Sequence, residues 1–299
     1  MLQIINKRKY FYFISATLVI SGLGAIFIWG MNFGIDFTGG TEMKIEFSQN
    51  IPKKNVIEEK LKELNLVGFS LKKGEKNLII LQYEKSDDDI NRKVFEKIKE
   101  IDSNAKQLSV NFIGTSVSSR LKTNAVEAIM LSILGIAIYI SVAFRKVSRP
   151  VSSWKYGLGA IIALAHDVII TAGIFSFLGH FYGVKTDVAF VAALLTILGY
   201  SVNDTIVVYD RIRENILRSG IKDEFESVIN RSLNETLARS INTSFTVIIV
   251  LVFLIIFGSE AIRYFSLALL IGVSFGTYSS IFVASALIAT IYKFQINRK

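Results

Sequence analysis

Six long apolar runs constrain this chain more than any other feature of its sequence. Each is close to the roughly 20 residues with which a helix crosses about 30 Å of hydrocarbon. With 51% hydrophobic residues and only two prolines in 299 residues, the chain is too apolar for an ordinary soluble domain. The sequence therefore predicts a polytopic α-helical membrane protein, whose six transmembrane helices we place at residues 10–30, 124–144, 156–179, 188–209, 240–258 and 264–292.

The distribution of basic residues predicts the orientation of these runs. The net charge is +9, and 18 lysines and arginines lie outside residues 32–122. All of these except Lys185 and Arg263 lie at the two ends of the chain or in the loops after the second and fourth runs. The positive-inside rule assigns such an excess to the cytoplasm, so the charge indicates a membrane orientation rather than a nucleic-acid partner. We expect cytoplasmic segments at 1–9, 145–155, 210–239 and 293–299, and extracytoplasmic segments at 31–123, 180–187 and 259–263.

The segment between the first two runs has the pattern of a folded α+β domain. Its apolar residues alternate as in strands, or recur at helical spacing, in six segments: 41–48 (strand), 53–65 (helix), 67–73 (strand), 77–84 (strand), 87–101 (helix) and 106–114 (strand). The order β-α-β-β-α-β predicts a ferredoxin-like extracytoplasmic domain between helices 1 and 2. So common a scaffold says little about function by itself.

Several kinds of site are disfavoured by what the sequence lacks. There is no cysteine, and two histidines, His166 and His180, are too few for a histidine-rich metal site. No Gly-x-x-x-x-Gly-Lys-Ser/Thr loop is present, because GFSLKKGEK at 68–76 has the wrong spacing. We therefore expect no metal site, no cofactor and no nucleotide hydrolysis by the chain itself.

Two aspartates lie inside the apolar runs. Asp167 is near the middle of the third run, and Asp204 lies ~9 Å of helix before the cytoplasmic end of the fourth. A charged side chain at mid-depth costs about 2.5–3.5 kcal/mol on insertion scales, so both should face the bundle interior or water. A carboxyl group that alternates between dry and wet surroundings can carry a proton. Asp167 and Asp204 are therefore the first candidates for proton coupling.

Polar residues accompany Asp204 on the fourth run and recur on the fifth. The residues at helical spacing are Thr196, Tyr200, Asn203 and Asp204 on the fourth run, and Arg239, Asn242, Thr243 and Thr246 on the fifth. If these two stripes face each other, Arg239 is the natural counter-ion of Asp204. The further candidates for proton coupling are Arg239, Asn203, Thr243, His166, Tyr200 and Thr246.

The same residues also have structural interpretations. Asp204 can be a hydrogen-bond node between two helices, and Asp167 can accept a hydrogen bond from Thr171 one turn later. Arg239 can be an interfacial anchor that reaches the lipid headgroups. His166 in such a run is more often a packing residue than a proton relay. The sequence leaves both interpretations open.

Two further patterns favour structural roles. The motif GIDFTGG contains Gly34, Asp36, Gly39 and Gly40, and we expect its last two glycines to permit a tight turn into the first strand while the aspartate bonds local backbone. In the sixth run, small residues recur at every fourth position, namely Gly272, Gly276, Ser280 and Ala284. That spacing is typical of close helix packing.

The charged segment 210–239 has one apolar face. Phe225, Val228, Ile229 and Leu233 recur there at helical spacing among charged residues. We expect this face to lie along the membrane surface, with docking of a cytoplasmic partner as the alternative.

Five motifs together resemble the SecF family, membrane subunits of the bacterial protein-export machinery. They are FGIDFTGGT (33–41), AHDVIITAGIFS (165–176), GYSVNDTIVVYDRIREN (199–215), ETLARSINTS (235–244) and LIGVSFGTYSSIFVASAL (270–287). The resemblance covers nearly the whole chain in matching order. One departure lies in FIGTSVSSRL (112–121), where many members carry Gly-Pro and this chain has Gly114 followed by Thr115.

The resemblance implies an auxiliary subunit of the bacterial cytoplasmic (inner) membrane that works with SecD and the SecYEG channel on a translocating unfolded polypeptide. SecD and SecF together resemble the resistance-nodulation-division superfamily, which uses the proton gradient rather than ATP. Asp204 and Arg239 match the family positions that are linked to proton passage. The outward domain is implied to help draw the polypeptide out.

Two other functions are compatible with parts of the sequence. A proton-driven exporter of small molecules or lipids in the same superfamily would need a partner too, because a single six-span half has no obvious pore for such a ligand. An intramembrane aspartyl protease would also need two aspartates, but its Gly-x-Gly-Asp signature is missing from this chain. We therefore expect a transport component rather than an enzyme.

Overall fold

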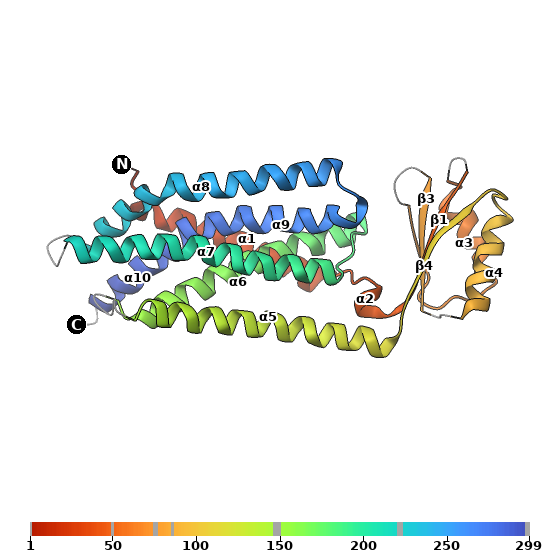
Figure 1. The fold of residues 1–299 in the computed structure, drawn as a ribbon, viewed down its shortest axis with the longest axis horizontal. Coiled ribbons are helices and arrows are strands. Elements are labelled where there is room, and N and C mark those ends of the chain that lie inside the picture. The colour runs from red at the N-terminus through yellow and green to blue at the C-terminus, as the bar shows by residue number, and fades with distance from the viewer. Residues whose placement is uncertain are drawn as a thin grey trace. The chain divides into compact units, whose positions relative to one another are not determined.

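The chain folds into two compact units. One, the membrane unit, comprises residues 1–32 and 126–299, and the other, the α+β unit, comprises residues 33–125. The computed structural model describes residues 2–48, 51–73, 77–84, 87–145, 151–219 and 224–296, which Figure 1 shows as a ribbon. Five of the basic residues used to predict the orientation lie outside this described part: Lys146, Arg149, Lys222, Arg298 and Lys299.

Within the described residues, six helices are long and apolar enough to cross a membrane, which confirms the predicted number. An α-helix closes its own backbone hydrogen bonds, as the hydrocarbon core requires. The last of the six is interrupted by a π-helical turn. The bounds are α1 Arg8–Trp29, α5 Thr115–Ala143, α6 Ser153–Tyr182, α7 Val188–Ser219, α8 Phe225–Phe257, α9 Glu260–Ser279, the π-helical turn Ser280–Ala284 and α10 Ser285–Ile296.

Several helices are longer than the predicted spans. α5 begins at Thr115 rather than near residue 124, because its polar first turns continue the same helix. α7 continues to Ser219 and α8 begins at Phe225, so most of the segment 210–239 belongs to two long helices rather than to a separate loop. These helices therefore extend beyond the apolar runs that predicted them.

The amphipathic face of segment 210–239 is covered by the protein. Phe225, Val228, Ile229 and Leu233 are all buried, and three of them belong to the main hydrophobic cluster of the membrane unit. Polar contacts join the same stretch of α8 to the end of α7, including Asn215 Nδ2 to Ser232 Oγ at 2.9 Å. The expected position along the membrane surface is therefore wrong, since contacts within the bundle bury this face instead.

The α+β unit has the predicted β-α-β-β-α-β order. Its four antiparallel strands lie in the order β2-β3-β1-β4, which is the ferredoxin-like arrangement. Alternate strand residues and one face of each long helix form a single apolar core. The bounds are α2 Ile35–Thr38, β1 Gly40–Glu46, α3 Lys54–Lys62, β2 Ser70–Lys73, β3 Leu78–Tyr83, α4 Asp88–Lys99 and β4 Lys106–Ile113.

Small residues bring the membrane helices close together. A Cβ atom at Gly173 of α6 would collide with Gly22 of α1, so these two helices touch backbone to backbone. On α9, a Cβ at Gly272 would meet Ile197 of α7, and one at Gly276 would lie 3.0 Å from Ser201 Cβ. Such contacts let helices associate where lipid removes the hydrophobic driving force. The seam of small residues thus packs α9 against α7.

Candidate functional site

Asp167 lies at the centre of the membrane unit, on α6. Its side chain is fully buried. Its Oδ1 lies 2.9 Å from His166 Nδ1, and its Oδ2 accepts hydrogen bonds from Ser201 Oγ of α7 at 2.6 Å and Ser279 Oγ of α9 at 2.8 Å. The predicted alternative partner, Thr171, instead donates its hydroxyl to the Asp167 backbone carbonyl at 2.8 Å. The carboxyl group therefore joins three helices.

Asp204 occupies a comparable position on α7. Ser240 Oγ of α8 donates to its Oδ1 at 2.5 Å, and the hydroxyl of Ser280, at the start of the π-helical turn, donates to its Oδ2. Only 7% of the residue is exposed. Like Asp167, this carboxyl group is held by serine hydroxyls on neighbouring helices, which suits either a protonated or an ionised form because a hydroxyl can donate or accept.

Arg239 is not the partner of Asp204. Within the described residues no ion pair joins the two, and Arg239 is exposed on the outer face of α8. The reason is geometric, because successive helical residues point about 100° apart. Since Ser240 points inward to Asp204, its neighbour Arg239 points away. The expected counter-ion contact within this chain is therefore wrong, whereas Asp204 itself is buried in the bundle.

The remaining stripe residues divide between the two faces. Asn203, Thr243 and Thr246 are exposed, and both threonine hydroxyls bond carbonyls of their own helix. Tyr200 is half-buried, and its hydroxyl donates to Ser244 Oγ of α8 at 3.3 Å. The two predicted stripes thus meet only along one edge, and their other members line the outside of this chain.

His166 lies between Asp167 and a groove on the face of the bundle beside α1. Its ring stacks on Tyr278 with centroids 6.0 Å apart, and its buried Nε2 atom has no hydrogen-bond partner in the structure. His166 also lines a groove of about 370 Å³ beside α1, together with Tyr12 and Ser15. The histidine therefore lies between the buried carboxyl group and this groove.

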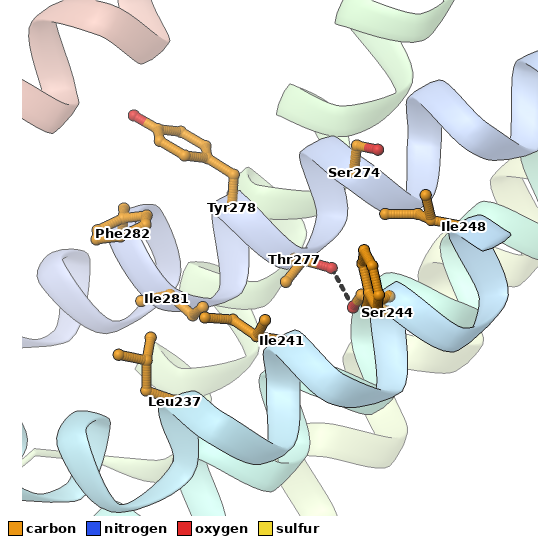
Figure 2. Close-up of a pocket in the computed structure, with 10 residues that line it drawn as sticks. Leu237, Ile241, Ser244, Ile248, Ser274, Thr277, Tyr278, Ile281 and Phe282 are labelled. Carbon is orange, nitrogen blue, oxygen red and sulfur yellow. Dashed lines mark hydrogen bonds between the residues drawn. The ribbon is translucent and has the colours of Figure 1, made fainter.

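A second groove, of about 280 Å³, runs between α8 and α9. Figure 2 shows its largely apolar lining and the hydrogen bond between Ser244 and Thr277 that joins the two helices. Since Tyr200 also bonds Ser244, a chain of hydroxyl groups connects α7, α8 and α9 here. On α8, Ser244 lies one turn after Ser240, and Thr277 lies three residues before Ser280, so these contacts are close to the serines that hold Asp204.

The decisive partners that sequence reasoning missed are serines. Ser201, Ser240, Ser279 and Ser280 donate to the two carboxyl groups, and all four are buried. The one feature of the sequence that could have pointed to these serines is their place inside apolar runs. It is clearest for the adjacent pair at 279–280. Serine is common in membrane helices as a small packing residue, so position alone did not assign them to aspartates.

The glycine motif after α1 has the backbone that only glycine adopts readily. Gly39 has φ +74° and Gly40 has φ +110°, and a Cβ at Gly40 would lie 2.7 Å from the Tyr83 carbonyl oxygen. Gly34 precedes the short helix α2, and Asp36 lies in its first turn. This geometry leads the chain directly into β1.

Residues suited to a metal are few. Within the described ranges, no three His, Asp or Glu side chains gather in one place. Asp167 and Asp204 are surrounded by hydroxyl groups and one imidazole. Carboxyl, hydroxyl and imidazole groups are able to take up and release protons.

Family models and known proteins match nearly all of this sequence. The model "Protein export membrane protein SecD/SecF, C-terminal" matches residues 93–294, and the SecD/SecF GG motif matches residues 24–51. Among curated proteins, the protein translocase subunit SecF of Thermobaculum terrenum is 40% identical and that of Sebaldella termitidis 36% identical. The alignments cover 97% and 98% of this chain and 94% and 93% of those proteins.

The fold also matches a solved structure. SecDF from Thermus thermophilus, a translocon-associated membrane protein, is 32% identical with a TM-score of 0.84. The match covers 97% of this chain but only 38% of that longer chain. The order of motifs, the six membrane helices and the ferredoxin-like unit agree with the sequence comparisons. The chain belongs to the SecF family of protein translocase subunits.

Proposed function

We propose that this chain is an auxiliary subunit of the Sec translocase, which works with SecD and uses the proton motive force to complete export of unfolded polypeptides. The observation that carries the proton-coupling role is the pair of buried aspartates, each held by hydroxyl groups or an imidazole among the described residues. A permanently charged carboxylate there would face a cost of about 2.5–3.5 kcal/mol. Gain and loss of a proton relieves that cost at each step.

The proposed setting is the bacterial inner membrane. The excess of basic residues supports cytoplasmic termini and, with them, an outward position of the α+β unit. The proposed partners are SecD, the SecYEG channel, the translocating polypeptide, protons and the lipid bilayer. The solved chain that this chain matches over 38% of its length is named SecDF, which supports SecD as a partner.

In this proposal Asp204 takes up a proton from one side and releases it to the other. Each unit charge that crosses the membrane releases about 2.3 kcal/mol per 100 mV. Because Asp204 accepts from both α8 and the last helix, a change in its charge alters how those helices are held. A few protons per cycle therefore supply enough free energy to move helices and the attached α+β unit.

The exposed stripe has a role in the same proposal. Arg239 and Asn203 lie on the outside of this chain, at membrane depth or near it. A charged residue there favours a polar partner over lipid. We assign this face to SecD, so that Arg239 acts on the proton path from the interface between the two subunits, with Thr243 beside it.

The test of the proton role is Asp204→Asn, compared with Asp210→Asn. Asp210 lies on the same helix but is exposed, so its replacement removes the same charge outside the bundle. We expect Asp204→Asn to leave assembly with SecD intact and to abolish the gradient-dependent part of precursor export in membrane vesicles. Asp210→Asn should export normally. Normal gradient-dependent export by a well-expressed Asp204→Asn protein would refute the role.

The test of the partners is a pull-down from native membranes. Recovery of SecD and SecYEG supports export. Recovery of a periplasmic adaptor and an outer-membrane channel instead would support the exporter alternative. The curated relatives reported above are named as translocase subunits, which favours the first outcome and a transport rather than an enzymatic function.

A further inference from the structure

Two adjacent serines each donate a hydrogen bond to a different buried carboxyl group. Ser279 Oγ donates to Asp167 Oδ2 at 2.8 Å, and the hydroxyl of Ser280 donates to Asp204 Oδ2. Both serines are fully buried. Because they are neighbours in the chain, one peptide unit of the last membrane helix connects the surroundings of an aspartate on α6 with those of an aspartate on α7.

α7 supplies a second connection. Ser201 Oγ donates to Asp167 Oδ2 at 2.6 Å and lies one turn before Asp204 on the same helix. Asp167 is therefore hydrogen-bonded to α7 and to the last membrane helix. The contact between Asp204 and Ser280 joins the same two helices. Two ionisable groups in one such cluster titrate as a pair when their interaction exceeds about one pK unit.

Each of the paired serines has a second acceptor within reach. Ser279 Oγ lies 3.1 Å from the Gly276 carbonyl oxygen, and Ser280 Oγ lies 3.1 Å from the Thr277 carbonyl oxygen. A hydroxyl has one proton, so it donates to one acceptor at a time. When a carboxylate takes up a proton, its new O–H can donate to the serine oxygen, and the serine proton turns to the backbone carbonyl.

The helix is irregular at this point. Residues Ser280–Ala284 form the π-helical turn, and Ser285 Oγ donates to the Ser280 carbonyl oxygen at 2.8 Å. π-Helical turns occur frequently at functional sites, and hydroxyl bonds to a helix's own carbonyls bend it. The two serines thus stand where a change of hydrogen-bond acceptor acts on a turn that is already distorted.

The other titratable groups near this cluster are few. His166 contacts Asp167, Tyr278 of α9 stacks on His166, and Tyr200 of α7 reaches Ser244 of α8. Tyr12 of α1 lines the groove beside the histidine, and Arg239 of α8 points outward beside Ser240. Within the described residues, no lysine or arginine is paired with either aspartate.

We propose that Ser279 and Ser280 are positioning residues that couple the protonation of Asp167 to that of Asp204. A proton on one carboxyl group changes the orientation of its serine hydroxyl, and the shared peptide unit passes that change to the other. This inference deepens the proposed proton-coupling role of Asp204. It is measured without any export assay, so the two can fail separately.

The experiment is an infrared pH titration of the full chain in lipid nanodiscs, with any copurifying subunit retained. Asp167→Asn and Asp204→Asn identify the carboxyl band of each aspartate. We expect Asp204→Asn to shift the titration midpoint of Asp167 by about one pH unit or more, a tenfold change in proton affinity. In the protein carrying Ser279→Ala and Ser280→Ala, Asp204→Asn should shift that midpoint by less than half as much.

The single serine variants add a readout that a purely structural role would not move. Ser279→Ala should shift the carboxyl band of Asp167, and Ser280→Ala that of Asp204. Ser274→Ala is the matched control, because Ser274 lies on α9 and bonds only the Leu270 carbonyl among its described contacts. An Asp167 midpoint unaffected by Asp204→Asn, or a shift that keeps more than half its size in the double alanine variant, would overturn the proposal. If the alanine variants do not fold, the first of these results still decides it.

Discussion

The interiors of the two units have opposite chemistry. The α+β unit buries a core of aliphatic and aromatic residues, such as Met43, Ile79 and Leu81. The membrane unit buries, besides apolar residues, two aspartates, a histidine and many serines and threonines, while it exposes large apolar side chains such as Leu131 of α5 and Phe253 of α8. One unit is built to exclude water, and the other to gather polar groups away from lipid.

The contrast between the two interiors shows which interactions stabilise each unit. In water, burial of apolar surface supplies about 25 cal/mol per Å². In lipid that term is largely absent between helices, so close contact of small residues and hydrogen bonds replaces it. The α+β unit is therefore stabilised by burial of apolar side chains, and the membrane unit by small and polar residues. Mutations should distinguish these two kinds of stabilisation.

The largest effect is expected from Gly173→Leu. Gly173 of α6 touches Gly22 of α1 backbone to backbone, so a leucine forces the two helices apart. We expect the free energy of unfolding to fall by well above the roughly 1–3 kcal/mol typical of overpacking. The measurement is the disappearance of the monodisperse peak in detergent. Gly24→Leu is the matched control, since a Cβ there meets nothing within 4 Å. Equal damage from both variants would contradict close packing as the cause.

The second prediction compares two leucines. Leu81→Ala removes a fully buried side chain from β3 and should cost the α+β unit about 2–5 kcal/mol, seen as faster amide hydrogen exchange of its strands. Leu131→Ala on α5 alters a side chain that is 66% exposed, and should change stability by less than about 0.5 kcal/mol. A large effect at Leu131 would show that a partner subunit, rather than lipid, covers α5.

A smaller effect is expected from Ser176→Ala on α6. The Ser176 hydroxyl reaches the carbonyl oxygens of Ala25 at 2.9 Å and Gly30 at 2.6 Å. Hydrogen bonds between membrane helices average about 0.6 kcal/mol and reach about 1.7 kcal/mol, so a loss in that range should appear in unfolding by a denaturing detergent. Thr17→Ala, which removes a bond within α1 alone, should leave stability unchanged.

The smallest prediction concerns pH and the α+β unit. Hydrogen bonds from the Ser48 hydroxyl and backbone N–H hold the pKa of the Asp102 carboxyl below its usual value of about 3.9. A lowered folded pKa means that the contribution is present above the ordinary pKa and is lost as pH falls through the folded value. The protection of the Ser48 amide, that is, its exchange rate relative to an unstructured peptide at the same pH, should therefore fall in acid. Asp102→Asn should abolish this dependence, and an unchanged profile would contradict it.

How far the sequence could predict the site is clear at Asp204. Its place inside an apolar run was enough to predict that it is buried, and it made Asp204 a candidate for proton coupling. Its partner was predicted wrongly, because helical periodicity gives the faces of one helix but not which neighbour each face meets. Adjacent residues then decided the outcome, since Ser240 points inward and Arg239 outward.

The same limit explains segment 210–239. Its amphipathic pattern correctly marked one face for burial, including Phe225 and Leu233. Whether lipid or protein covers such a face depends on the path of the next helix. α8 runs through residues 225–239 of this segment as one helix that packs on the bundle, so the bundle covers the face.

Patterns in the amino-acid sequence were enough to predict six membrane helices, the strand and helix order of the α+β unit, and the burial of Asp167 and Asp204. These follow from local properties, namely run length against membrane thickness and the periodicity of apolar residues. That Ser279 and Ser280, on a distorted helix far along the chain, hold the two aspartates became visible in the folded bundle alone. That choice depends on how several helices pack at once, which no local pattern encodes.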